Sequence, residues 1–206
     1  VIFAIGLAAL VLKALDVAAQ HGALGQSPLA VAEAAIRPAG DLKQRCAVLL
    51  QQLDQLPPAR QREYYISRLR AALERVRSRG STEGLDDYLD YLADLDSARQ
   101  HASYALFRVI VWSIPILGFL GTVVGITMAL NSVDLRAPDE SMVEVLTGLG
   151  VKFDTTALAL SLSIVLMFVQ FFVEKAESSL LQRVARRVSE EILSRFPPTD
   201  RASDPV

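Results

Sequence analysis

The sequence predicts an all-α integral membrane protein whose long transmembrane helices extend into a cytoplasmic helical bundle. Of its 206 residues 51% are hydrophobic and 21% are charged, so the apolar residues must lie in separate blocks. Two apolar runs, residues 109–131 and 151–173, are each long enough for a transmembrane helix, which needs about 20 residues. We therefore expect a membrane protein with a substantial aqueous part.

A third apolar run opens the chain at residues 1–13 and is shorter than a bilayer requires. Because the first residue is Val rather than Met, we interpret this run as a partial transmembrane helix, the inner half of a truncated N-terminal span. The alternative is a signal peptide remnant, for which Ala8, Ala9 and Ala14 would supply the small residues of a cleavage site.

The basic residues predict the orientation in the membrane. Lys13 and the twelve Arg or Lys residues of segment 14–108 lie between the first and second spans, and six more lie in the tail, residues 174–206. The connection at residues 132–150 holds only Arg136. Since Lys and Arg accumulate on the cytoplasmic side, we expect the large segment and the helical tail to be cytoplasmic and the connection to be short and periplasmic.

Proline and glycine pairs divide the cytoplasmic segment into helices. An amphipathic stretch, with Leu42, Val48, Leu49 and Leu53, precedes Pro57–Pro58, and Gly80–Ser81 ends a second stretch, residues 60–79. These two stretches predict a helical hairpin. From residue 81 we expect one long helix that runs into the second span, and we expect the third span to continue as a helix to the Phe196–Pro197–Pro198 stop.

The cytoplasmic helices differ in charge. The stretch after Pro58 carries seven arginines: Arg60, Arg62, Arg68, Arg70, Arg75, Arg77 and Arg79. The stretch after Gly80 carries six acids: Glu83, Asp86, Asp87, Asp90, Asp94 and Asp96. We interpret them as mutual partners, across antiparallel helices or between subunits. A basic surface that binds anionic lipid or another protein is the alternative.

Several classes of protein are excluded by the sequence. A net charge of −2 argues against a nucleic-acid-binding protein, which needs an excess of Lys and Arg. The only cysteine, Cys46, has no disulfide partner and fits a small core residue. His21 and His101 have no metal ligands at suitable spacing, and no phosphate loop or nucleophile motif is present. We expect no metal, no cofactor and no enzyme activity.

Small and hydroxyl-bearing residues line one face of each of the last two spans, because residues three, four and seven apart share a helix face. The face of the second span comprises Pro115, Gly118, Thr122, Gly125 and Ala129. The face of the third span comprises Thr156, Ala159 and Ser163, while Thr155 points about 100° away. At a rise of about 1.5 Å per residue, Thr122 and Thr156 fall in nearly one layer.

Two interpretations of these faces remain open. In the first, Thr122, Thr156, Thr155 and Ser163 serve an ion pathway, and the small residues Pro115, Gly118, Gly121, Gly125 and Ala159 pack along it. In the second, small residues such as Gly121 and Gly125 merely let two membrane helices approach closely, and each threonine bonds a carbonyl of its own helix. Two hydroxyl-bearing faces at similar depth favour the ion pathway.

Lys152 and Asp154 are charged residues at the start of the third span. An ionised side chain near the bilayer centre costs about 2.5 to 3.5 kcal/mol, so we place both near the outer interface. Asp154 is a candidate ion-entry acid at the channel mouth. A helix-end carboxylate or an intersubunit salt bridge is the alternative.

The two spans also resemble a known family. The segments ILGFLGTVVGI (residues 116–126) and GLGVKFDTTALALSLS (residues 148–163) are similar to the signature of the MotA/TolQ/ExbB proton channel family, and the Gly–Thr pair is closer to the TolQ/ExbB branch. The resemblance covers about the last hundred residues.

The resemblance implies a stator subunit of an inner-membrane motor in bacteria. In that family a homopentamer surrounds two copies of a single-span ExbD/TolR/MotB-like partner, and threonines matching Thr122 and Thr156 face the partner's membrane aspartate. Proton flow, or sodium flow, then drives motion. This chain has no carboxylate in mid-membrane, so a partner acid is needed. The alternative function is a non-conducting membrane scaffold that anchors cytoplasmic helices.

Overall fold

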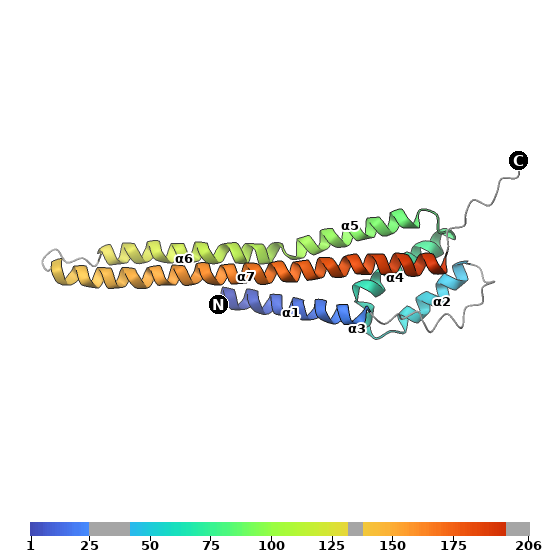
Figure 1. Cartoon of the computed structure of the whole chain (residues 1–206), viewed down its shortest axis with the longest axis horizontal. Helices are drawn as coiled ribbons and strands as arrows, with labels where there is room; N and C mark the ends of the chain where they lie inside the picture. Colours follow the sequence, from blue (N-terminus) through green and yellow to red (C-terminus); the bar gives the residue numbers. More distant parts are fainter. Residues whose placement is uncertain (25–41, 132–137, 197–206) are drawn as a thin grey trace, which may run out of the picture. The chain divides into compact units, whose positions relative to one another are not determined.

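The computed structural model describes residues 1–24, 42–131 and 138–196, and all regular structure in these residues is α-helical. The helices, shown in Figure 1, are α1 (Ile2–Ala23), α2 (Leu42–Asp54), α3 (Pro58–Gln61), α4 (Tyr64–Arg79), α5 (Leu85–Ser103), α6 (Ala105–Asn131) and α7 (Pro138–Arg195). The predicted all-α class is confirmed.

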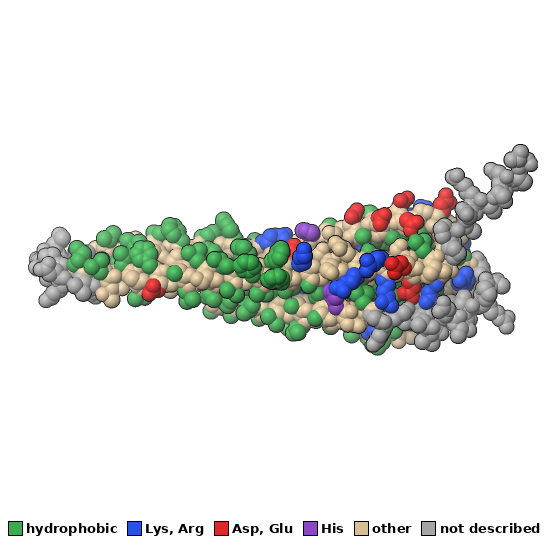
Figure 2. Space-filling view, in the orientation of Figure 1, with side chains coloured by type: hydrophobic (Ala, Val, Ile, Leu, Met, Phe, Trp, Pro, Cys, Tyr) green, Lys and Arg blue, Asp and Glu red, His purple; other side chains and the backbone are tan. Residues whose placement is uncertain are grey.

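Three helical stretches are long and apolar enough to cross a membrane: Ile2–Ala23, Leu85–Asn131 and Val145–Arg195. Large apolar side chains stay exposed on them; Trp112 is 73% exposed and Phe172 is 65% exposed. In Figure 2 hydrophobic side chains cover α6 and the neighbouring part of α7, whereas charged side chains gather over α4, α5 and the end of α7. An exposed apolar surface of this extent is typical of helices in contact with lipid.

Several helix boundaries differ from the sequence predictions. Helix α1 runs past residue 13 to Ala23, and α7 begins at Pro138, so most of the expected connection 132–150 is helical; residues 132–137 lie outside the described part of the chain. The long helix expected from residue 81 begins at Leu85 and is interrupted at Tyr104, between α5 and α6. Tyr104 is fully buried, with the Lys13 ammonium 4.4 Å from its ring centre, so tertiary packing rather than a Pro or Gly sets the interruption.

The chain divides into two compact units, which are described separately. The first comprises residues 1–14 and 103–175, and the second comprises residues 15–102 and 176–206. The first unit contains the start of α1, all of α6 and the first part of α7. The second contains α2 to α5 with the ends of α1 and α7. The candidate site lies in the first unit.

The second unit is built on the predicted helical hairpin. Helix α2 buries Cys46, Leu49 and Leu53, and α4 buries apolar residues at helical spacing, which are Ile66, Leu69, Leu73 and Val76. Val48, which the sequence places in the same amphipathic stretch, is 38% exposed. The stretch 60–79 is not one helix, because α3 ends at Gln61 and α4 begins at Tyr64. Helix α4 ends at Gly80, whose left-handed φ of 70° suits glycine.

Charged residues of this unit pair only in part as predicted. Arg68 of α4, 4% exposed, lies 2.6 Å from Asp96 of α5 and also donates to the Leu92 carbonyl. Arg70 instead pairs with Asp54 of α2, at 2.5 Å. Breaking a buried pair leaves an uncompensated charge, so Arg68 and Asp96 fix α4 against α5.

Two tyrosines at the start of α4 bind carboxylates of α7. The Tyr64 hydroxyl donates to Glu177 at 2.8 Å, and the Tyr65 hydroxyl donates to Glu191. Burial, and then the neighbouring carboxylate, raises the pKa of each phenol above its ordinary value. Both phenols therefore remain donors at neutral pH.

The packing of the second unit predicts that Cys46 is unreactive. Its side chain is fully buried, and burial raises the pKa of the thiol to about 11, so little thiolate forms at pH 8. We expect alkylation by a maleimide in mild detergent to be at least tenfold slower than after denaturation. Glu74→Cys, at an exposed site of α4, is the control and should react rapidly. Equal rates at the two positions would contradict this core.

Candidate ion-pathway site

Helices α6 and α7 run antiparallel and side by side through the first unit (Figure 1). A Cβ atom built on Gly118 would lie 2.7 Å from Cβ of Ala159, and one built on Gly125 would lie 2.5 Å from Cγ of Lys152. A side chain at residue 118 would overlap Ala159, whereas one at residue 125 would have to displace the flexible side chain of Lys152. Gly118 therefore sets how closely α6 approaches α7, as small residues do in membrane helix pairs. We call this contact the α6–α7 seam.

Thr122 and Thr156 meet in the seam. Their hydroxyl groups are hydrogen-bonded to each other, and the Thr156 hydroxyl donates to the Gly118 carbonyl at 2.9 Å. Thr122 is 7% exposed, whereas Thr156 is half-buried. The predicted shared layer is thus a direct contact across two helices. The ion-pathway role of the two residues remains a prediction.

Each threonine also has an acceptor in its own helix. The Thr122 hydroxyl lies 3.3 Å from the Gly118 carbonyl, and the Thr156 hydroxyl lies 3.3 Å from the Lys152 carbonyl. Bonds of this kind satisfy a hydroxyl inside a membrane at little cost. If one hydroxyl donates to another group, the other can therefore still donate to a carbonyl of its own helix.

Ser163 and Pro115 form the second polar feature of the seam. Proline has no N–H group, so Pro115 cannot donate to the carbonyl of Val111 one turn earlier. The Ser163 hydroxyl, 3% exposed, donates to that carbonyl at 2.8 Å. Because a carbonyl in the bilayer needs a partner within the protein, this bond gives Ser163 a structural role. Its predicted ion-pathway role receives no support from these contacts.

Gly121 and Thr155 lie away from the seam. A Cβ on Gly121 would have no neighbour within 4 Å in the single chain, and its packing role remains a prediction. Thr155 is exposed, and its hydroxyl donates to the Val151 carbonyl at 2.7 Å. Both residues line a shallow groove of about 530 Å³ beside the start of α1. The 100° offset of Thr155 from Thr156 explains this separation.

The charged residues of α7 near the seam have different surroundings. The methylene carbons of Lys152 cover Gly125, and such a stem can carry its ammonium toward the interface. Asp154 is exposed on α7, and its role in ion entry remains a prediction. Lys152 is the seam residue that the sequence analysis missed. Helix periodicity places it one turn before Thr156, on the same face, but its charge argued against a packed position.

The first unit also contains polar contacts outside the seam. Lys13 donates to the Ser103 hydroxyl at 2.7 Å, and Arg108 lies 3.9 Å from Glu174. These pairs lie just beyond the apolar stretches of α6 and α7. Charged residues at such a position are typical of a membrane boundary.

The fold and the seam define a class, that of multi-pass α-helical membrane proteins with a hydroxyl-bearing contact between two spans. A family model described as the MotA/TolQ/ExbB proton channel family matches residues 61–185, which is more than half of the chain. The chain belongs to this family. Searches of curated proteins and of solved structures returned no match.

The family match also corrects the extent of the resemblance. It begins at residue 61, well before the last hundred residues, and therefore includes α4 and α5 of the second unit. It ends at residue 185, within α7. Helices α4 and α5 are thus part of the family pattern and not only similar to it in length and helicity.

The seam predicts unequal effects of alanine at two neighbouring glycines. Gly118→Ala should lower the free energy of unfolding by about 1 to 3 kcal/mol because its methyl group would overlap Ala159. Gly121→Ala, where the space is open, should be neutral or slightly stabilising. Unfolding in mixed detergent micelles measures both. Adding Ala159→Gly should restore Gly118→Ala, and equal losses at the two glycines would contradict the seam.

The Pro115–Ser163 relation predicts a specific coupling. Ser163→Ala alone leaves the Val111 carbonyl without its donor and should cost about 1 kcal/mol. In a Pro115→Ala background, the new N–H at residue 115 can bond that carbonyl, so the same change should cost much less. A double-mutant cycle of unfolding free energies isolates the coupling. A coupling near zero would show that Ser163 does not serve this carbonyl.

Proposed function

We propose that this chain is an ion-channel subunit, a stator in an inner-membrane motor of a bacterium. Five copies would surround the transmembrane helices of two copies of a single-span partner of the ExbD/TolR/MotB kind. Ion-motive force would be converted into motion of one component against the other. Membership of a proton channel family supports this role.

The observation that carries the proposal is the hydroxyl pair of Thr122 and Thr156. Both hydroxyls lie where α6 and α7 contact each other, and each has an acceptor in its own helix. A hydroxyl has one proton to donate. When one threonine donates it to an approaching carboxylate, the other can still donate to its own helix, so the helix pair can stay intact. Once it had taken up a proton, the acid would be neutral, and its interaction with the same hydroxyls would differ from that of the charged carboxylate.

We infer that the acid comes from another polypeptide. Residues 109–131 and 155–173 contain no Asp or Glu, while Lys152 and Asp154 stand at the start of the third span and Asp16 lies in α1. The middle of the second and third spans therefore supplies no carboxylate. An aspartate on the partner's transmembrane helix would supply it. Cycles of protonation would then change which subunit of the ring the partner binds most strongly.

The transported ion is expected to be a proton, with sodium as the alternative, and no cofactor is expected. Segments 14–108 and 174–206 hold twelve and six Lys or Arg residues, against one in the connection 132–150, which supports cytoplasmic placement of the second unit. Asp154 would then lie toward the periplasmic side, where an acid could concentrate cations at the channel entrance.

The function is tested by removing the hydroxyls while keeping the shape. In proteoliposomes that hold the chain with its partner, Thr122→Val combined with Thr156→Val should reduce ion flux at least tenfold. Thr127→Val is the matched control, because Thr127 is exposed and bonds only the Val123 carbonyl of its own helix. The control should keep its flux, and native mass spectrometry should show the same assembly for all variants.

A scaffold would behave differently in the same experiment. If the chain only anchors cytoplasmic helices, the wild-type complex conducts no ions, and the threonine variants match it in every assay. Intact assembly without any ion flux in the wild type would therefore refute the channel and favour the scaffold.

A further inference from the structure

Helix α5 has an acidic outer face. Four carboxylates lie on its exposed side at helical spacing, Asp86, Asp87, Asp90 and Asp94, while Leu85 and Leu89 face the core. Tyr91 stands among these acids and is 59% exposed. Figure 2 shows the acidic side chains gathered over α5. We call this surface the α5 acidic face.

Three of the arginines expected to neutralise this face contact other residues. Arg68 pairs with Asp96, Arg70 pairs with Asp54, and Arg75 lies over the ring of Tyr88. None of the ion pairs in the described residues includes one of the four exposed acids. The α5 acidic face therefore presents its charge to whatever lies outside the subunit.

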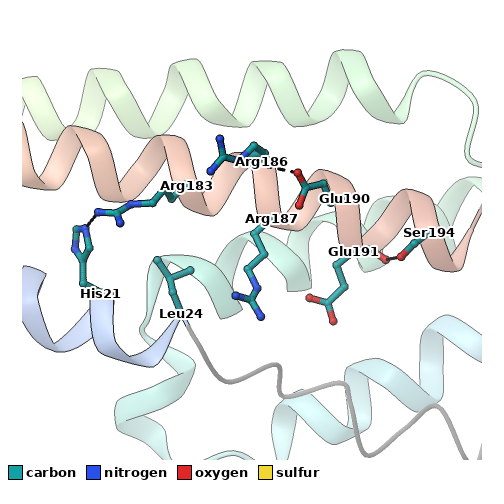
Figure 3. Close-up of a pocket in the computed structure, with 8 residues that line it drawn as sticks. All are labelled: His21, Leu24, Arg183, Arg186, Arg187, Glu190, Glu191 and Ser194. Carbon is teal, nitrogen blue, oxygen red and sulfur yellow. Dashed lines mark hydrogen bonds and ion pairs between the residues drawn. The ribbon is translucent and has the colours of Figure 1, made fainter.

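The same unit has an arginine-lined hollow at the end of α7. Figure 3 shows Arg183, Arg186 and Arg187 of α7 around it, with Glu190 and Glu191 of the same helix, His21 in the last turn of α1, and Leu24 just after α1. Its volume is about 540 Å³, which exceeds that of a tyrosine side chain. Leu24 gives it an apolar surface beside the guanidinium groups.

The charge of the hollow is only weakly balanced within the chain. Arg183 is hydrogen-bonded to Nε2 of His21, and Nδ1 of the same ring bonds the Val17 carbonyl, so Arg183 has no carboxylate partner among these contacts. Arg186 lies 4.0 Å from Glu190, and both side chains are more than 70% exposed, so this pair contributes little. Glu191 is engaged by Tyr65 and Arg195.

We propose that the α5 acidic face of one copy docks into the arginine-lined hollow of the next copy. Tyr91 would enter the hollow beside Leu24, and Asp87, Asp90 and Asp94 would pair with the arginines. Charged groups one turn apart on each helix, such as Asp90 with Asp94 and Arg183 with Arg187, have matching spacing. Exposed Tyr and Arg are the side chains that most often anchor interfaces.

This inference rests on the proposed ring and assigns its cytoplasmic contact. The two surfaces differ from each other, so each copy offers one and receives the other, which is a heterologous contact that can close into a ring. Opposite charges would also disfavour contact between two identical faces. At each contact, one copy thus supplies the α5 acidic face and its neighbour supplies the arginine-lined hollow.

Cysteine cross-linking of the full chain in membranes tests the contact. In a Cys46→Ala background, Asp90→Cys and Arg186→Cys in one chain should give, on oxidation, a ladder of species that ends at the ring size. Either cysteine alone should give no ladder. Glu74→Cys with Arg186→Cys is the matched control, because Glu74 is exposed on α4 outside the α5 acidic face.

Native mass spectrometry separates this inference from the proposed function. An intact ring with no more cross-linking than the control would refute the contact and leave the channel untouched. A wild-type chain that remains monomeric would refute both the contact and the ring.

Charge reversal supplies the second arm of the test. Asp90→Arg with Asp94→Arg should lower the oligomer fraction severalfold, and Arg183→Asp with Arg186→Asp should do the same. The four changes together should restore most of it, whereas Glu74→Arg should have no effect. Failure of the combined variant to recover, with its subunits folded by circular dichroism, would show that these surfaces do not meet.

Discussion

The close approach of α6 and α7 at Gly118 is the constraint on which the rest of the site depends. Because Gly118 has no side chain, Ala159 can pack directly against it, and the Thr156 hydroxyl can reach the Gly118 carbonyl at 2.9 Å. In lipid, every polar group of the backbone must find its partner within the protein. The same approach lets Ser163 reach the carbonyl that Pro115 leaves without a donor. A wider seam would lose packing and hydrogen bonds together.

The sequence predicted the membrane class and the shared layer of the two threonines because both follow from local rules. Apolar blocks of bilayer length identify spans, and helix periodicity with a fixed rise places Thr122 level with Thr156. The same periodicity could not tell which glycines of α6 pack against α7, because the neighbouring helix determines which side of a helix is packed. Only Gly118 and Gly125 face α7 closely; Gly121 lies in the open groove. The pairing of Arg70 with Asp54 likewise needed the fold.

Ser163 shows what the sequence could have indicated but did not. Proline at residue 115 removes one donor, so the carbonyl of residue 111 needs another partner, which a side chain from another helix can supply. A serine on the facing span, at the right depth, is the expected donor. The interruption at Tyr104 had no such signal, because no Pro or Gly stands there and the buried ring with Lys13 nearby is a tertiary feature.

The central claim is that the hydroxyls of Thr122 and Thr156 border an axial cavity filled by another polypeptide. A cryo-electron microscopy map of the chain with its partner in lipid nanodiscs tests it most directly. The account predicts a closed ring with the α6–α7 seam of each copy turned toward central helical density that carries an acid at the level of the threonines. A map in which those threonines face lipid, or in which no helix occupies the axis, would contradict it.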